Sequence, residues 1–381
     1  MKSTHQFDVL VVYNQNIATS ASLNTNAAVP FSRLKGMNQY NRAYSFFLES
    51  CNKNKISAAF TTTSDIMENG ICKSYWEFSN NKWSKTIGNC YAKLVFDKFS
   101  PYGLFSRDAK SLFKRHTGVS PFNDSILHKL FDDKFKTYEK LTQFTIPTAE
   151  IVDSSLPAVF SALDKLEELI KIHPNSNDFK KSLIIKDRLG AGGRNIFKVD
   201  SNHAKKIFSI LNKHKNKSFL LQPFIEFDKG YSYKKSSTAT DIRIIYSQGK
   251  IVQAYVRTAK KNDFRCNEHQ GGTVKYLTEK DIPELVIRTG DKIVKKLDRK
   301  NALYTLDFIV SNNGNAYLLE GNINPGIYWG EGQKEDEAMT KQLTGIIVKE
   351  CRRKIDRGKY KLDNLILSPN FNAAPIYPAT P

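Results

Sequence analysis

Short apolar runs alternate with polar turns along residues 1–115. Residues 7–13 form a nearly continuous apolar run, residues 40–50 carry apolar side chains at helical spacing, and residues 56–61 form the next apolar run. A strand, a helix and a strand in this order predict a β-α-β beginning. Residues 19–29 are rich in Ser, Asn and Ala, which favours a loop.

From about residue 123 the pattern becomes a succession of amphipathic helices and short strands. Helical spacing predicts helices at residues 133–141, 158–172, 204–212, 284–297 and 335–353. Short apolar runs predict strands at residues 183–186, 196–199, 219–225, 242–247, 250–257, 302–310 and 316–319. Gln248-Gly249 separates two of these strands and predicts a hairpin. The segment from Leu362 onward holds four prolines, which predicts an extended or disordered tail.

The composition is that of an ordinary globular protein. With 381 residues, of which 40% are hydrophobic and 12% aromatic, the chain can bury a large core in two or three domains. No run of about 18 apolar residues predicts a membrane span, and the apolar run at residues 9–12 is too short for the core of a signal peptide. The five cysteines are scattered without metal-ligand spacing. We therefore expect a cytoplasmic protein with free thiols and no zinc site.

The formal net charge of +20 is the unusual global property of the chain. A positive field raises the local concentration of anions, so a nucleotide, an acidic peptide, a nucleic acid or an anionic membrane surface would all suit it. No segment has the basic and aromatic pattern of a nucleic-acid-binding module, and we expect no specific nucleic-acid partner and no membrane partner. A lysine-rich solvated surface explains the charge equally well, so charge alone does not select a function.

A glycine-rich loop at residues 189–194 follows Lys186 and lies between two predicted strands. Glycines let backbone N–H groups approach phosphate oxygens, and successive N–H groups form an anion-binding nest. The loop is not a P-loop, because no Gly-Lys-Ser/Thr follows it, and it is not a Rossmann fingerprint, because it lies in a hairpin. Taken alone it fits an ordinary flexible hairpin, but the positive charge of Lys186 favours nucleotide binding.

Two carboxylates and one amide are predicted to lie together on adjacent strands. Asp307 and Glu320 belong to the two arms of a hairpin, and Asn322 is on the same face as Glu320 because side chains alternate along a strand. Buried carboxylates on apolar strands need a cation or a base to neutralise them. Hard oxygen ligands in this arrangement favour Mg²⁺ shared with phosphate groups, although a structural salt bridge with a lysine is the alternative.

Two arginines follow the second predicted hairpin, Arg257 and Arg265, together with Asn267. Arginine beside a metal-bound triphosphate can stabilise the charge that develops during phosphoryl transfer. Each arginine taken singly would be interpreted as a surface residue. Their proximity in sequence to the proposed metal ligands makes them candidate catalytic residues.

Together these motifs resemble the ATP-grasp superfamily, and above all the RimK-type ribosomal-protein glutamate ligases and the glutathione-synthetase-like ligases. The resemblance spans residues 123–350 and rests on an ordered series: Lys134, Lys186, Gly190-Ala-Gly192-Gly193, Gln222-Pro-Phe-Ile225, Asp241-Ile-Arg243, Arg257, Asp263-Phe-Arg-Cys-Asn267, Gly271-Gly272, Asp307 and Glu320-Gly-Asn322-Ile-Asn-Pro-Gly326. The resemblance implies an α/β (α+β) protein with the ATP-grasp fold and an N-terminal α/β pre-ATP-grasp domain.

The resemblance also implies domain boundaries. These are an N-terminal domain at residues 1–120, a small lid region with the glycine loop at 121–215, a metal and nucleotide region at 216–355, and an extended tail at 356–381. Two segments depart from the family pattern. Residues 226–240 are longer than the usual link, and the first 115 residues match no particular relative. Because both could carry substrate contacts, the substrate cannot be inferred from the family.

Roles for individual residues follow from the same resemblance. Lys134 and Lys186 would contact ATP phosphates under the loop that contains Gly190, Gly192 and Gly193. Pro223 and Phe224 would present their backbone to adenine. The remaining implied site residues are Asp241, Arg265 and Asn267 in the nucleotide site, Asp307, Glu320 and Asn322 around one or two Mg²⁺ (with Mn²⁺ as an alternative), and Arg257 beside an acyl phosphate.

The predicted function is an ADP-forming, ATP-dependent ligase that joins a carboxylate to an amine through an acyl phosphate. No Ser-His-Asp or Cys-His constellation is evident, which agrees with a reaction that needs no protein nucleophile. The substrates could be an amino acid or an acidic peptide, and a homo-oligomer is an open option. Two alternatives remain: a ligase that modifies a protein or peptide by glutamylation or crosslinking, and a catalytically silent nucleotide-binding protein of the same fold.

Overall fold

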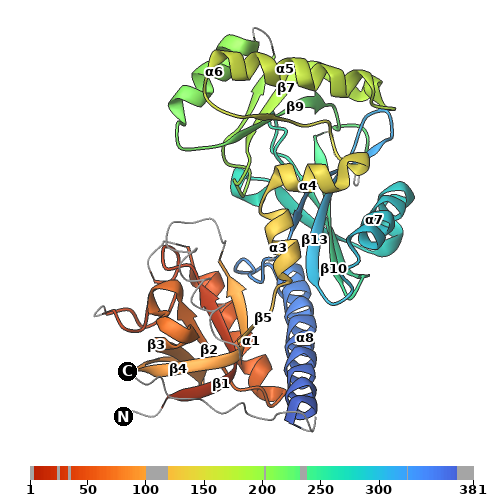
Figure 1. Cartoon of the computed structure of the whole chain (residues 1–381). Helices are drawn as coiled ribbons and strands as arrows, with labels where there is room; N and C mark the ends of the chain where they lie inside the picture. The colour runs from red at the N-terminus through yellow and green to blue at the C-terminus, as the bar shows by residue number, and fades with distance from the viewer. Residues whose placement is uncertain are drawn as a thin grey trace, which may run out of the picture. The chain divides into compact units, whose positions relative to one another are not determined.

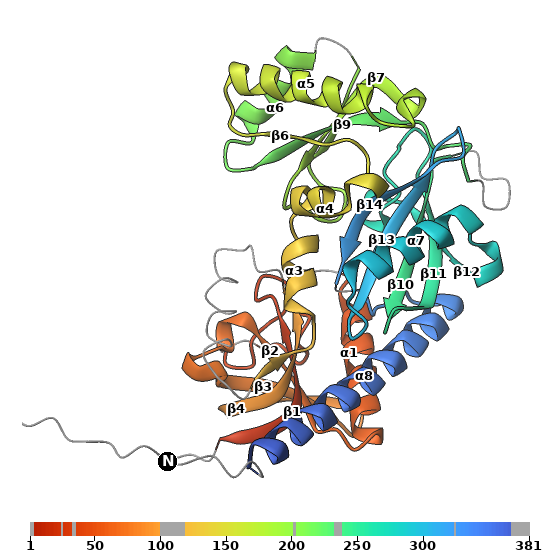
Figure 2. The same cartoon turned by 45° about the vertical axis from the view of Figure 1, so that its right-hand side comes forward.

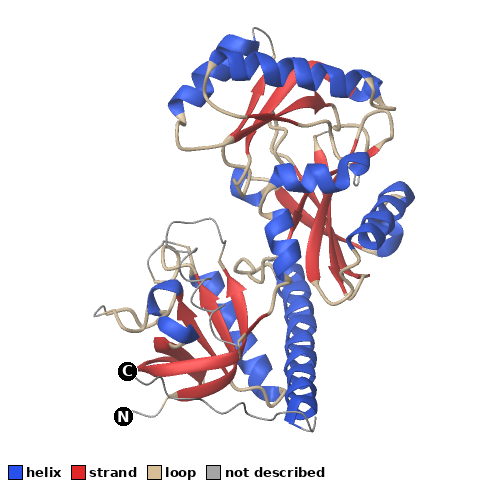
Figure 3. Cartoon of the chain, viewed as in Figure 1, coloured by secondary structure: helices blue, strands red, loops and turns tan. Residues whose placement is uncertain are grey.

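The computed structural model describes residues 4–23, 26–32, 36–99, 119–200, 203–231, 238–323 and 325–366. The chain divides into two compact units (Figures 1 and 3). The first unit consists of Met1–Phe99, Gly103–Phe122 and Ile327–Pro381, and the second consists of Ser100–Tyr102 and Asn123–Gly326.

The first unit begins with the predicted β-α-β arrangement. Strand β1 (His5–Tyr13), helix α1 (Asn38–Lys53) and strand β2 (Ala58–Thr62) follow one another, and β1 pairs with β2 in parallel. Helix α1 buries the residues whose spacing predicted it: Ala43, Tyr44, Phe47 and Leu48. The β-α-β prediction is therefore confirmed.

A long hairpin completes this sheet. Strands β3 (Cys72–Ser79) and β4 (Lys82–Lys98) pair in antiparallel fashion, and β4 also lies parallel to β1 and to the short strand β5 (Ser120–Pro121). The turn between β3 and β4 contains Asn80 and Asn81, whose φ angles are 49° and 59°. Asparagine tolerates this left-handed backbone better than most residues, which suits it to the turn.

Helix α8 (Lys334–Ile366) belongs to the first unit and packs against α1 and β4. It extends beyond the predicted end at residue 353 and into residues 356–366, which were expected to be an extended tail. The reason is that no proline lies between Pro325 and Pro369, so every residue of this stretch has the backbone N–H that helical hydrogen bonding needs. Residues 367–381 lie outside the described part of the chain.

The second unit contains a four-stranded antiparallel sheet in the order β6, β9, β7, β8. These strands are Ala149–Ile151, Phe219–Ile225, Phe179–Asp187 and Ile196–Val199. Helices α5 (Leu156–Lys171) and α6 (His203–Lys213) cover one face of the sheet, as Figure 1 shows. The core between them includes Val159, Leu166, Ile185, Ile207 and Leu221.

The second sheet of this unit has five antiparallel strands in the order β12, β11, β10, β13, β14. They are Thr273–Leu277, Lys250–Thr258, Thr240–Ser247, Leu303–Val310 and Ala316–Asn322. Helix α7 (Glu284–Leu297) covers one face (Figure 2), where Val286 and Ile293 join a core with Ile244, Val256 and Phe308. Because side chains alternate along strands, the polar residues of β10, β13 and β14 lie on the opposite face.

Two short helices connect the N-terminal side of the second unit to its five-stranded sheet. Helices α3 (Ser125–Phe131) and α4 (Lys134–Leu141) are N-capped by Asp124 and Asp133. Leu127, Phe131 and Leu141 join the core of the five-stranded sheet, whereas β9 pairs within the four-stranded sheet. The residues that pack on each sheet are therefore not separated at residue 215, where the expected ranges 121–215 and 216–355 meet.

Short 3₁₀ helices complete the described secondary structure at Thr63–Asp65, Glu68–Gly70, Thr142–Phe144, Ser176–Asp178, Glu268–Gln270 and Glu279–Asp281. All five cysteines are buried and unpaired by disulfides. Within the described ranges, every helix is too short or too polar to cross a membrane.

Candidate functional site

A pocket that is open to solvent lies in the second unit, lined by residues from both of its sheets. The pocket is lined by nearly all of the residues singled out in the sequence: Lys134, Lys186, Gly190, Gly192, Gly193, Pro223, Phe224, Asp241, Arg257, Arg265, Asn267, Asp307 and Glu320. Asn322 is not part of this lining, although its side chain contacts Glu320.

The glycine loop joins β7 to β8 in the predicted antiparallel hairpin, with Lys186 paired to Ile196 at its base. Gly192 and Gly193 have φ angles of 68° and 71°, a left-handed backbone that favours glycine. A Cβ atom at Gly193 would lie 2.8 Å from Oδ1 of Asn267, so this position has no room for a side chain. The loop tip therefore rests directly on the segment that follows β11.

Lys134 and Lys186 approach the loop from two different elements. Lys134 is the first residue of α4, and its ammonium donates a hydrogen bond to the carbonyl oxygen of Gly190. Lys186 is at the end of β7 and is buried. Burial, followed by the neighbouring charge of Lys134, lowers the pKa of Lys186 to about 7 despite the opposing effect of Glu320. An anion bound between these two lysines would offset the repulsion between their positive charges.

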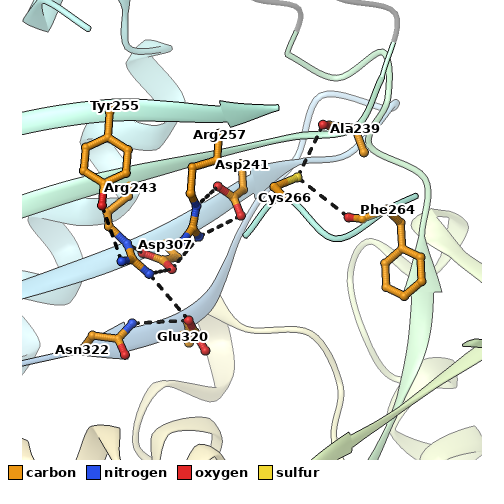
Figure 4. A network of polar contacts seen from close by, with 10 residues as sticks. All are labelled: Ala239, Asp241, Arg243, Tyr255, Arg257, Phe264, Cys266, Asp307, Glu320 and Asn322. Carbon is orange, nitrogen blue, oxygen red and sulfur yellow. Dashed lines mark hydrogen bonds and ion pairs between the residues drawn. The ribbon is translucent and has the colours of Figure 1, made fainter. Parts of the chain in front are cut away.

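The carboxylates of the site are held by two arginines rather than by a lysine (Figure 4). Arg257 donates from Nε and Nη2 to the two carboxylate oxygens of Asp241 at 2.7 and 2.8 Å, and from Nη2 to Asp307 at 2.8 Å. Arg243 donates from Nε and Nη2 to both oxygens of Asp307. The salt bridge expected as the alternative is thus present, but its cations are Arg243 and Arg257 and not a lysine.

Strand register explains why these side chains meet. Asp241 is opposite Arg257, Arg243 is opposite Asp307, and Asp307 is opposite Glu320. Burial alone would raise the pKa of Asp307, but the charges and hydrogen bonds of Arg243 and Arg257 hold it below its usual value. Asp307 is therefore ionised at neutral pH despite being almost completely buried.

The side chains of β13 and β14 include oxygen atoms of the kind that a hard divalent cation accepts, although both Asp307 oxygens already accept hydrogen bonds from arginines. Asp307 and Glu320 are directly paired across the two strands, and Asn322 Nδ2 lies 3.3 Å from Glu320 Oε1. Asp241, Asp307 and Glu320 carry three formal negative charges against the two positive charges of Arg243 and Arg257, which leaves one negative charge. Two carboxylates and an amide oxygen, with remaining positions for water and phosphate, are what Mg²⁺ usually accepts in proteins.

The opposite end of the pocket is apolar and aromatic. The Phe224 and Phe264 rings pack edge to face at 5.7 Å, and Lys198 Nζ lies 4.1 Å from the Phe224 ring centroid. Ile184 and Leu319 also line this region, although no sequence motif indicated them as site residues. Alternation offered a signal, because Ile184 is two residues before Lys186 on the same strand face. A flat apolar ring would fit this end of the pocket.

Arg265 lines the pocket, and its guanidinium forms an ion pair with Asp263, two residues before it in the chain. Its Nε and Nη2 atoms donate to Asp263 at 3.1 and 2.9 Å, and 31% of its side chain is exposed. Asn267 is adjacent to Gly193 of the glycine loop. The Asp-Phe-Arg-x-Asn motif therefore forms one wall of the pocket.

Arg188, which no motif indicated, connects the glycine loop to α4. Its Nε and Nη2 atoms each donate to Asp133 at 2.7 Å, and Nη1 donates to Glu150. Its backbone carbonyl accepts a bond from Lys134 N at 3.2 Å. Sequence could not reveal this contact, because Asp133 and Arg188 are separated by two helices and two strands, α4, β6, α5 and β7.

Comparison with known proteins places this site in a family. The model of the RimK-like ATP-grasp domain matches residues 131–343, more than half of the chain. The chain belongs to the RimK-like ATP-grasp family. A probable alpha-L-glutamate ligase of Legionella pneumophila is 28% identical over 240 residues, covering 62% of this chain and 68% of that protein. A probable alpha-L-glutamate ligase of Parasynechococcus marenigrum is 33% identical over 178 residues, covering 45% of this chain and 33% of that protein.

Solved structures show the same fold at low sequence identity. D-alanine–D-alanine ligase from Bacillus anthracis, complexed with ATP, has a TM-score of 0.54 and 14% identity, covering 92% of this chain and 99% of that one. D-cycloserine synthetase has a TM-score of 0.53 and 12% identity, covering 89% of this chain and 99% of that one. The predicted ATP-grasp fold is confirmed, and membership of the RimK-like family supports ATP-dependent carboxylate–amine ligation as the class of chemistry.

Proposed function

We propose that this RimK-like protein is a Mg²⁺-dependent, ADP-forming ligase that makes an amide through an acyl phosphate. One observation carries the proposal: two lysines, a glycine loop, two arginines and the Asp307–Glu320 pair all line a single pocket. The lysines and arginines are suited to phosphate groups, and the carboxylates are suited to the metal that accompanies them.

Each part of the pocket has a proposed role. Lys134 and Lys186 contact the phosphates, and the N–H groups of the loop containing Gly190, Gly192 and Gly193 close over them. Pro223 and Phe224 hold the adenine ring at the apolar end. Asp241, Arg265 and Asn267 complete the nucleotide site, with Arg257 and Arg265 near the transferred phosphoryl group.

Asp307, Glu320 and Asn322 are the proposed holders of Mg²⁺, which when bound offsets the negative charge of the phosphates. A carboxylate oxygen of one substrate then forms a bond to the γ-phosphorus as the bond to the ADP oxygen breaks. An amine nitrogen attacks the acyl carbon, loses a proton, and phosphate departs. Positioning and electrostatic stabilisation supply the rate enhancement, because neither step uses a protein nucleophile.

L-Glutamate is the first amine to test, because relatives of this chain include proteins named as probable alpha-L-glutamate ligases. An acidic peptide is the first carboxylate partner to test, because a net charge of +20 attracts anionic substrates. The test incubates the protein with ATP, Mg²⁺, L-glutamate and synthetic acidic peptides, and follows ADP release and peptide mass. Addition of a glutamyl residue with matching ADP supports the proposal. ATP binding without product from any acceptor would favour a catalytically silent nucleotide-binding protein.

The low pKa of Lys186 predicts proton uptake when ATP binds. In the free protein this pKa is lowered to about 7, so at pH 8 most molecules carry a neutral amine. Phosphate groups beside the amine favour the charged form and raise its pKa, so binding takes up a proton and ATP affinity falls as pH rises above 7. Calorimetry at pH 8 in buffers of different ionisation enthalpy measures this uptake. Lys186→Met should abolish it, and wild-type binding without proton uptake would contradict the assignment.

A further inference from the structure

Arg243 has hydrogen-bonding capacity that the nucleotide site does not use. Of its guanidinium donors, Nε and Nη2 bond to Asp307, and Nη2 also lies 3.7 Å from Glu320 Oε1. Nη1 faces the other way, toward the Tyr255 hydroxyl at 3.5 Å (Figure 4). At this distance the hydrogen bond is long and weak. An anionic ligand that accepts shorter hydrogen bonds from Arg243 Nη1 and the Tyr255 hydroxyl would therefore displace it at little cost.

Arg243 and Tyr255 belong to one transverse row across the five-stranded sheet. Register places Tyr276, Tyr255, Arg243, Asp307 and Glu320 directly opposite one another on successive strands. The Tyr255 and Tyr276 rings meet edge to face with centroids 5.7 Å apart. All five side chains share the sheet face opposite α7, because positions directly opposite each other in a sheet point the same way.

The row continues the proposed metal site away from the nucleotide. Asp307 and Glu320 line the nucleotide pocket, but Arg243, Tyr255 and Tyr276 do not. Arg243, Tyr255 and Tyr276 are each partly exposed, and 15% of the Arg243 side chain is accessible. The Arg243 guanidinium thus bonds to Asp307 through Nε and Nη2, whereas its Nη1 atom points toward Tyr255, outside the nucleotide pocket.

We propose that Arg243 Nη1 and the Tyr255 hydroxyl bind the carboxylate of the substrate that becomes phosphorylated, with the Tyr276 ring as an apolar wall beside it. This inference rests on the proposed function and names the substrate class of the same site. The donor set consists of N–H and O–H groups, which select an anion. Its connection through Arg243 to Asp307 and Glu320 puts that anion next to the transferred phosphoryl group, where a nucleophilic carboxylate must lie.

Removal of the Tyr255 hydroxyl tests the subsite without disturbing Asp307. The probe is tetra-L-glutamate, titrated by calorimetry onto protein that is saturated with a non-hydrolysable ATP analogue and Mg²⁺. Tyr255→Phe should weaken the peptide Kd about 10-fold, the typical effect of losing a hydrogen bond to a charged group, and leave the Kd of the ATP analogue within about twofold. Tyr91→Phe is the matched control, because its hydroxyl bonds to Gln6 in the other unit.

The outcomes separate this inference from the proposed function. Absence of tetra-L-glutamate binding by the wild-type protein, or an equal peptide Kd in the wild type and Tyr255→Phe, contradicts the subsite. A weaker Kd for the ATP analogue alone would assign Tyr255 to the nucleotide instead, and also contradicts it. Peptide binding that depends on Tyr255, but yields no ADP when ATP and L-glutamate are supplied, supports the subsite and counts against the proposed ligase reaction.

Discussion

Replacing Asp307 with Asn is expected to abolish ligation and to destabilise the second unit. The Asp307 carboxylate is 1% exposed and accepts hydrogen bonds from both Arg243 and Arg257. Without its charge, two buried guanidinium groups lose a shared partner, which costs about 3 kcal/mol of unfolding free energy. The loss of a metal ligand should lower turnover at least about 1,000-fold. Thermal unfolding and ADP release with an active acceptor measure the two effects.

Glu320→Gln separates metal binding from stability. Glu320 is 25% exposed, and its carboxylate lies 3.7 Å from Arg243, so this ion pair contributes less than about 1 kcal/mol. The variant should unfold within a few degrees of the wild type, yet require a much higher Mg²⁺ concentration for half-maximal activity. Wild-type activity and Mg²⁺ dependence in both Asp307→Asn and Glu320→Gln would contradict the metal assignment.

Replacing Arg188 with Gln should weaken ATP binding about 10-fold, although Arg188 does not line the pocket. Its guanidinium bonds to the buried carboxylate of Asp133, the N-cap residue of α4. Lys134 is the first residue of that helix. Burial alone would raise the pKa of Asp133, but Arg188 keeps it below its usual value. Without Arg188, the relative positions of Lys134 and the glycine loop are no longer fixed. The loss of stability should be about 2 kcal/mol.

A second ion pair in the chain provides a matched control. Arg353 and Glu350 on α8 have exposed fractions of 22% and 3%, close to the 21% and 5% of Arg188 and Asp133. Arg353→Gln should therefore reduce stability to a similar extent without changing the Kd for ATP. Calorimetric titration of ATP onto both variants measures the difference. Equal ATP affinities in Arg188→Gln and the wild type would exclude a positioning role for Arg188.

Local sequence patterns predicted the elements that carry the site. The bounds of β9 and α7 coincide with the predicted ranges, and the hairpins β7–β8 and β10–β11 form as expected. Their apolar periodicity and turn residues are local signals, so they need no knowledge of tertiary structure. The Asp307–Glu320 pairing was predictable for the same reason, because one short turn joins β13 to β14.

Contacts between distant segments could not be predicted in this way. Arg243 meets Asp307 because β10 lies beside β13, although helix α7 and two strands separate them in sequence. Arg188 meets Asp133 because the segment after β7 lies beside the first residue of α4, where Lys134 N donates to the Arg188 carbonyl oxygen. No local pattern encodes the register of strands that are far apart, so the sequence identified the ligand-like residues and missed the arginines that position them.

Transfer of ¹⁸O from a labelled carboxylate tests the central claim, that a substrate carboxylate is phosphorylated by ATP in this pocket. An acidic peptide with ¹⁸O-labelled carboxylates is incubated with the protein, ATP, Mg²⁺ and L-glutamate, and the released phosphate is analysed by mass spectrometry. Because the acyl C–O bond breaks when the amine attacks, we expect one ¹⁸O atom in phosphate for each amide formed. Amide formation with unlabelled phosphate would contradict an acyl phosphate intermediate.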